Sequence, residues 1–241
     1  MEEGILQNDN VDDDDTSSST ATAMDDTDKN LEPLEISPPG KASTRFGNVS
    51  VFQLDHKSGD PEGLDIIFSS LLFMIDTAKE SLDLYFGYFQ LFEELDAALT
   101  RAAQRGVKIR LVTNSSGTNG LTYLNNLFCP ALERLLELGA KIYTTRKCDE
   151  GKICFHNKDV IADSRVALFG SWNCIGTSIF YDSDFSVLLF DENGGVFTPY
   201  RQKIDDLIKV DRLLRVTEVS GFDVPLFYKI FGNRTVMRRG F

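Results

Sequence analysis

The sequence predicts a three-layer α/β/α domain, in which helices cover both faces of a mixed, mostly parallel central sheet. Along the chain, short segments with continuous or alternating apolar residues, typical of strands, are followed by amphipathic segments of about 12 to 16 residues, typical of helices. This alternation favours a layered α/β domain over an all-helical or all-β one. The length of 241 residues is sufficient for one domain of ordinary size and a tail.

The predicted strands are short segments with alternating or continuous apolar residues, and they cover residues 49–54, 82–89, 107–113, 141–145, 166–169 and 185–190. The predicted helices carry apolar residues at helical spacing, and they cover residues 64–79, 92–104, 130–137 and 197–208. Pro130 suits the first position of its helix, while Gly106 and Gly139 suit the positions just after a helix. The pattern assigns no structure to the segment from Asp211 onward.

Residues 1–45 are predicted to be a disordered acidic tail, and residues 46–241 a single domain. The chain has 37 acidic and 25 basic residues, and 12 of the acids but only 3 of the bases lie in the first 45 positions. Such a segment has too little apolar surface to fold. A solvating tail is the simplest interpretation, with a regulatory arm or a targeting segment as alternatives. The domain is then close to electrically balanced, which does not favour a nucleic-acid binder by bulk charge.

The start of the chain has neither the basic nor the apolar region of a signal peptide, and no apolar run is long enough for a membrane-spanning helix. We therefore expect a location in the cytoplasm or at an intracellular membrane surface. The four cysteines show no C-x-x-C spacing, so free thiols are expected. A zinc site built from Cys148, Cys154 and His156 is a weaker alternative, because C-x5-C-x-H is not a usual zinc pattern.

The chemically most informative stretch is the pattern H-x-K-x4-D-x6-G-S-x-N, whose fixed positions are His156, Lys158, Asp163, Gly170, Ser171 and Asn173. Side chains two residues apart on a strand share a face, so His156 and Lys158 project together. An imidazole beside a cation and neutral donors suits a tetrahedral anion, with the imidazole nitrogen as nucleophile at phosphorus. There is no run of carboxylates typical of a two-metal site, so we expect no metal and no cofactor.

This pattern resembles the HKD signature of the phospholipase D superfamily with its trailing G-S-x-N. The resemblance implies a phospholipase D-like half fold and a phosphohistidine intermediate at His156. It assigns phosphate binding to Lys158, Ser171 and Asn173, and a place in the catalytic motif, more structural than chemical, to Asp163. Asp184 stands 11 residues after Asn173, where the family has an acidic residue, usually within N-x-E, that hydrogen-bonds the catalytic histidine.

The upstream sequence is similar to bacterial cardiolipin synthases, to the C-terminal half of which the chain is closest. The similar stretches are Tyr88-Phe89 and residues 105–110, 113–115 and 135–143. One departure is Gly87, where those enzymes usually have proline before Tyr-Phe. This departure is expected to affect the substrate channel.

The family chemistry needs two histidines, one to attack phosphorus and one to protonate the leaving oxygen. The chain has only His56 and His156. His56 lies in Asp55-His56-Lys57, without the H-x-K spacing, and is predicted to be a surface loop residue. We therefore expect a homodimer with two facing His156 residues, or a second HKD-bearing chain.

Three functions are consistent with these features. The first is a phosphodiesterase or phosphatidyltransferase that acts on phospholipids, with possible peripheral membrane contact. The second is a metal-independent endonuclease of the single-HKD type, for which nucleic acid is the substrate. The third is a non-catalytic half that binds a partner, which the complete motif disfavours.

Overall fold

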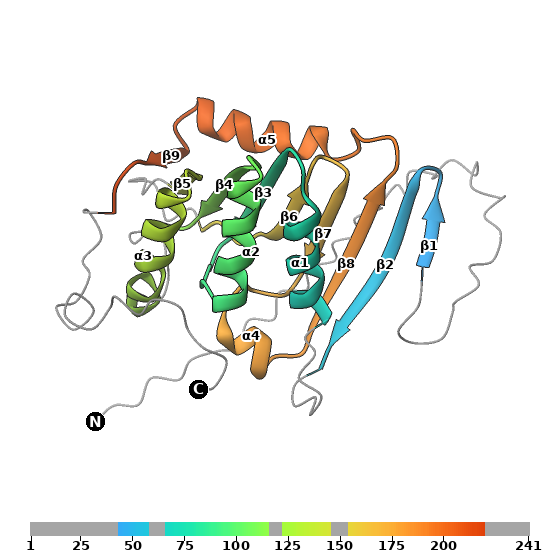
Figure 1. Ribbon diagram of the computed structural model, residues 1–241, viewed down its shortest axis with the longest axis horizontal. Coiled ribbons are helices and arrows are strands. Elements are labelled where there is room, and N and C mark those ends of the chain that lie inside the picture. The colour runs from blue at the N-terminus through green and yellow to red at the C-terminus, as the bar shows by residue number, and fades with distance from the viewer. Residues whose placement is uncertain (1–42, 58–65, 116–121, 146–153, 220–241) are drawn as a thin grey trace, which may run out of the picture. The chain divides into compact units, whose positions relative to one another are not determined.

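The computed structural model describes residues 43–57, 66–115, 122–145 and 154–219. Its strands form one nine-stranded sheet with the order β1-β2-β8-β7-β6-β3-β4-β5-β9 (Figure 1). The strands are β1 (Ser43–Phe46), β2 (Val49–His56), β3 (Ser81–Phe86), β4 (Lys108–Thr113), β5 (Lys141–Thr145), β6 (Lys158–Ala162), β7 (Val166–Gly170), β8 (Asp184–Asp191) and β9 (Leu213–Val216).

The sheet is mixed, as expected, but the expectation that it is mostly parallel is wrong. Among the described strands only the β3/β4 and β4/β5 pairs are parallel, and the other six pairs are antiparallel. Parallel neighbours need a long crossover such as a helix. The connection from β6 to β7 is instead a tight turn, in which Asp163 and Ser164 both have positive φ angles. Such a turn joins antiparallel strands.

Helices cover both faces of the sheet, which confirms the predicted α/β/α layering. They are α1 (Ile66–Thr77), α2 (Glu93–Gln104), α3 (Thr122–Glu137), α4 (Gly176–Phe180) and α5 (Thr198–Lys209). The helices α1, α2 and α3 lie on one face of the sheet (Figure 1). Their buried side chains pack with Leu84, Val160 and Leu188 of the sheet in one hydrophobic core. Phe197 and α5 pack on the opposite face, where Ile161 and Ala167 belong to a second core.

Several element boundaries differ from the predictions. The helix α3 begins at Thr122 rather than at Pro130, which lies inside it. A proline removes one hydrogen bond within a helix but does not by itself mark the helix start. β1 begins at Ser43, so the predicted domain boundary between residues 45 and 46 falls inside a strand. β9, in the segment that the pattern left open, pairs with β5.

The segments 116–121 and 146–153, and the first residues of the predicted helix 64–79, lie outside the described residues. Most of the tail 1–45 lies outside them as well. Among the described helices, none combines the length and the apolar character needed to cross a membrane.

Candidate active site

The backbone around His156 is held by a buried amide at the end of the neighbouring parallel strands. The side chain of Asn114, the residue directly after β4, brackets Phe155: its Oδ1 accepts from Phe155 N at 2.7 Å, and its Nδ2 donates to Phe155 O at 2.9 Å. The same Nδ2 donates to Gly87 O at 2.9 Å. On the other side of His156, the carbonyl of Asn157 accepts from Gly87 N at 3.1 Å. The residues before and after His156 are therefore both tied to the end of β3 and β4.

Gly87 is required by this close approach of the two backbones. A Cβ atom at Gly87 would lie 2.3 Å from the carbonyl oxygen of Phe155. Real Cβ atoms do not approach backbone oxygens so closely, and a proline would also remove the N–H that binds Asn157. The departure from the cardiolipin synthase pattern at Gly87 therefore allows the backbone of Phe155, the residue before His156, to pack closely against position 87.

His156 and Lys158 lie at the start of β6, with His156 just outside the strand. The His156 side chain is exposed, and Lys158 Nζ donates to the carbonyl oxygen of His156 at 2.8 Å. Burial lowers the pKa of Lys158, and the nearby charges of Asp159, Cys154 and Asp184 oppose that shift. The ammonium group is thus partly removed from water next to the backbone of His156, where a phosphate oxygen would find a cation.

The Gly170–Asn173 segment leaves β7 with a conformation that depends on Gly170. A Cβ atom there would lie 2.2 Å from Ser186 Oγ and 2.3 Å from Phe185 O. Trp172 is only 1% exposed and packs against the rings of Phe68 and Phe86. The buried indole anchors the segment and holds Ser171 and Asn173 on either side of it.

Ser171 contacts Asp184, the predicted orienting carboxylate. Ser171 Oγ donates to Asp184 Oδ1 at 2.6 Å and accepts from Phe185 N at 3.1 Å. Within the described part of the chain, the buried atoms Asp184 Oδ2 and Asn173 Oδ1 have no hydrogen-bond partner. The expected hydrogen bond from the His156 imidazole to Asp184 is not formed in this single chain, so the second carboxylate oxygen can still accept one.

The sequence profile described as "Cardiolipin synthase, PLD-like domain" matches residues 71–208, which is more than half of the chain. That range contains the motif and the strands that carry it. The chain belongs to the phospholipase D superfamily.

Curated relatives of this phospholipase D-like chain are bacterial cardiolipin synthases A. The protein of Buchnera aphidicola is 30% identical over 132 residues, which cover 54% of this chain and 25% of that protein. The protein of Cronobacter sakazakii is 30% identical over 157 residues, which cover 65% of this chain and 30% of that protein. The chain therefore corresponds to less than a third of the length of these relatives.

Solved structures share the fold at low sequence identity. Phosphatidylserine synthase of Haemophilus influenzae matches with a TM-score of 0.61 and 15% identity, over 77% of this chain and 46% of that chain. The phospholipase D family member NUC of Salmonella typhimurium matches with a TM-score of 0.50 and 20% identity, over 70% of this chain and 98% of that chain. The phospholipase D-like α/β fold is thereby confirmed.

Asp163, the third member of the HKD motif, is not brought together with His156. It follows the far end of β6, about 16 Å from Lys158 for five residues of extended strand. Its carboxylate accepts from the backbone N–H groups of Lys79, Glu80 and Ser81 at 2.8, 2.8 and 2.9 Å. This geometry joins the β6–β7 turn to the start of β3 and supports a structural role within the motif.

Replacing Asp163 by Asn is expected to lower the free energy of unfolding by about 1–2 kcal/mol at neutral pH, with turnover per folded molecule unchanged. Asn accepts the positive φ of 53° at this position but loses one acceptor oxygen and the charge. Urea denaturation measures the change. An activity loss of more than about tenfold at unchanged stability would point to a chemical role instead.

The same experiment has a defined pH dependence. Burial raises the pKa of Asp163, but the N–H groups of Ser81, Glu80 and Lys79 outweigh it, so the pKa in the folded protein is lowered. The stabilisation is then fully present above the unfolded-state pKa of about 4 and is lost as the pH falls through the folded-state value. The difference between wild type and Asp163→Asn should shrink in acid.

His56 is not the surface loop residue that the sequence predicts. It is the last residue of β2, is 8% exposed, and pairs in register with Asp184 of β8. β2 extends to His56 because β8 provides a pairing partner along its full length. The alternation of buried Leu54 and His56 with exposed Gln53 and Asp55 was the available signal.

Asn114 is the site residue that sequence reasoning missed. Its signal was its position directly after a parallel strand, where polar groups gather at one edge of an α/β sheet. The zinc alternative is not tested, since Cys148 lies outside the described residues. Within the described residues, no group of three His, Cys, Asp or Glu side chains is arranged to hold a metal ion.

Proposed function

We propose that this chain is a phosphodiesterase or phosphatidyltransferase that acts on phospholipids through a phosphohistidine at His156. The observation that carries the proposal is the exposed imidazole of His156, whose neighbouring backbone is fixed by hydrogen bonds. The partly buried ammonium group of Lys158 donates to the carbonyl oxygen of the same residue. The negative charge of Asp184 counteracts the lowering of the Lys158 pKa that burial causes. The similarity to cardiolipin synthases supports a lipid phosphodiester as the substrate class.

In the proposed reaction an imidazole nitrogen of His156 attacks phosphorus, and the bond from phosphorus to the leaving alcohol oxygen breaks. A second imidazole donates its proton to that oxygen. Lys158 and Asn173 bind the non-bridging oxygens as their negative charge increases. The second imidazole then takes a proton from water or from an acceptor alcohol, whose oxygen attacks phosphorus and releases His156.

A single chain supplies only one of the two imidazoles. His56 is buried at the end of β2, so among the described residues His156 is the one exposed histidine. We therefore propose a homodimer in which the His156 residues of two copies face each other across a two-fold axis. A second HKD-bearing chain would satisfy the same requirement.

Purified protein in the presence of EDTA is the material for the test. It is incubated with vesicles that contain phosphatidylglycerol and cardiolipin, and separately with single- and double-stranded nucleic acid. We expect turnover of lipid. With a phosphate-labelled lipid, label should be trapped on the wild-type protein but not on His156→Ala. Lys158→Ala, which removes a proposed phosphate-binding group, should also lose turnover, whereas its control Lys203→Ala, which alters an exposed lysine of α5, should not.

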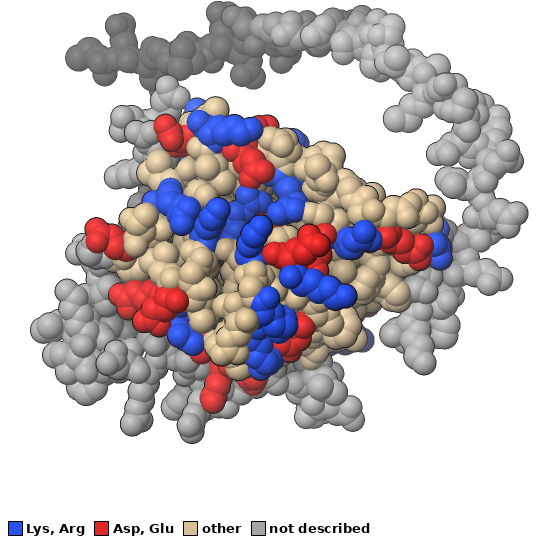
Figure 2. All heavy atoms as spheres, turned by 45° about the horizontal axis from the view of Figure 1, so that its top comes forward, with Lys and Arg blue, Asp and Glu red and all other residues tan. Residues whose placement is uncertain are grey.

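Turnover of nucleic acid without turnover of lipid would contradict the lipid assignment. Figure 2 makes this comparison necessary, because Lys and Arg side chains gather near the centre of the face that it displays, with Asp and Glu around them. A mixed surface of this kind selects neither a lipid nor a polynucleotide by charge alone. Absence of turnover and of labelled histidine would contradict the enzymatic proposal itself.

A further inference from the structure

On the face of the sheet opposite His156, three polar side chains form a closed hydrogen-bonded set. Asn157 Nδ2 donates to Asp159 Oδ2 at 2.8 Å and to the hydroxyl oxygen of Tyr200 at 2.5 Å. The Tyr200 hydroxyl in turn donates to Asp159 Oδ2. Tyr200 comes from α5, whereas Asn157 is the residue between His156 and Lys158.

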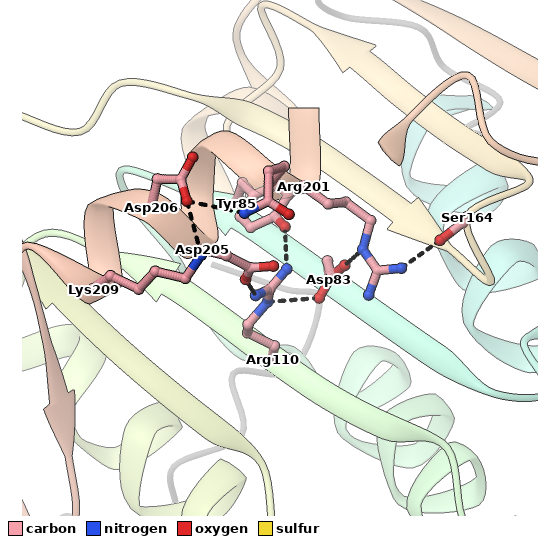
Figure 3. A network of polar contacts seen from close by, with 9 residues as sticks. Asp83, Tyr85, Arg110, Ser164, Arg201, Asp205, Asp206 and Lys209 are labelled. Atoms are coloured by element: carbon pink, nitrogen blue, oxygen red, sulfur yellow. Dashed lines mark hydrogen bonds and ion pairs between the residues drawn. The ribbon is translucent and has the colours of Figure 1, made fainter. Parts of the chain in front are cut away.

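The position of Tyr200 is itself fixed by a network of ion pairs beneath α5, shown in Figure 3. The adjacent residue Arg201 forms an ion pair with the buried carboxylate of Asp83, with its Nε 2.6 Å from Oδ2. Arg201 also donates to Ser164 Oγ in the β6–β7 turn. The Tyr200 ring packs edge-on against the rings of Tyr85 and Phe169. These contacts form a rigid support that holds the Tyr200 side chain in one position, with its hydroxyl group directed toward β6.

Side chains alternate between the two faces of an extended segment, so an anchor on one face restricts the neighbours on the other. His156 lies outside β6 and is exposed, so no ladder hydrogen bond orients it. Asn157 is held twice, by its carbonyl at Gly87 and by its side chain at Tyr200. The Tyr200 contact is therefore one of two contacts, beside that of Gly87, that fix the orientation of the peptide that follows His156.

We infer that Tyr200 is a positioning residue, whose hydroxyl acts through Asn157 and Asp159 to hold the His156 imidazole in its reactive orientation. The role of His156 in this inference rests on the function proposed above. Burial and the Asp159 carboxylate raise the pKa of Tyr200, so the phenol stays protonated and can donate at neutral pH. The contact joins the α5 layer to a site on the opposite side of the sheet.

The test compares Tyr200→Phe with Tyr85→Phe. Both substitutions remove one tyrosine hydroxyl from the layer between α5 and the sheet and keep the ring. The Tyr85 hydroxyl accepts from Arg110 and, within the described part of the chain, forms no hydrogen bond with Asn157 or Asp159. We expect Tyr200→Phe to lower kcat on the phospholipid substrate about tenfold with KM within about twofold. Tyr85→Phe should leave both parameters near the wild-type values.

A second readout does not depend on turnover. The chain has two histidines, so NMR of histidine-labelled protein gives two imidazole signals, and His156→Ala assigns them. In Tyr200→Phe the His156 signal should broaden or shift, while the His56 signal stays in place. Tyr85→Phe should change neither signal.

The inference is overturned if the His156 signal in Tyr200→Phe matches wild type, or if both variants change it equally. Failure of the wild-type protein to turn over phospholipid would overturn the proposed function and leave the NMR comparison intact. The two ideas can therefore fail separately.

Discussion

Replacing His156 by Ala is expected to lower turnover by on the order of 10³-fold or more, because the substitution removes the proposed nucleophile and every route through the proposed phosphohistidine. The exposed imidazole packs against little, so the melting temperature should change hardly at all. Steady-state assays and thermal unfolding of the same preparation measure the two effects. Residual activity within about tenfold of wild type would remove His156 from the proposed mechanism.

The same variant reports on the dimer. When wild type and His156→Ala are mixed in equal amounts and allowed to exchange subunits, random pairing leaves about a quarter of the dimers with two intact histidines. Activity should then fall to about a quarter of that of undiluted wild type at equal total protein. A value near one half would mean that each chain works alone, and the requirement for a facing His156 would be wrong.

Replacing Asp83 by Ala is expected to lower the free energy of unfolding by about 3–5 kcal/mol. The Asp83 side chain is 3% exposed and lies between Arg110, 2.7 Å from its Oδ1, and Arg201, 2.6 Å from its Oδ2. Its removal leaves two guanidinium groups beneath α5 without their shared counter-charge, although Arg110 keeps Asp205. Urea denaturation measures the loss.

The matched control is Asp76→Ala, which breaks an ion pair of similar length. Asp76 and Arg101 are 2.7 Å apart, but their side chains are 40% and 51% exposed. Water screens such a pair, so the expected cost is about 1 kcal/mol or less. If the two substitutions cost the same, the network beneath α5 is not a stabilising element, and the rigid support inferred for Tyr200 loses its basis.

Much of the fold was predictable because the order of apolar and polar residues within a segment reflects which side chains are buried. The alternating apolar residues of β2 and the helical spacing in α2 report which side chains face the core. The sheet order and the number of antiparallel pairs were not predictable in this way. They depend on which strands meet in space, and β9 became recognisable only through its pairing with β5.

The candidate site likewise combines features that the sequence predicts with features that only the tertiary structure shows. By itself, the sequence determined the family and predicted the nucleophile and the cation that accompanies it, because His156, Lys158, Ser171 and Asn173 stand at fixed offsets within one short stretch. Only the tertiary structure decided what holds that stretch. Asn114 brackets Phe155 from 41 residues away, and Tyr200 reaches Asn157 from 43 residues away. The spacing of residues along the chain does not predict such contacts, because packing between the layers of the fold brings these residues together.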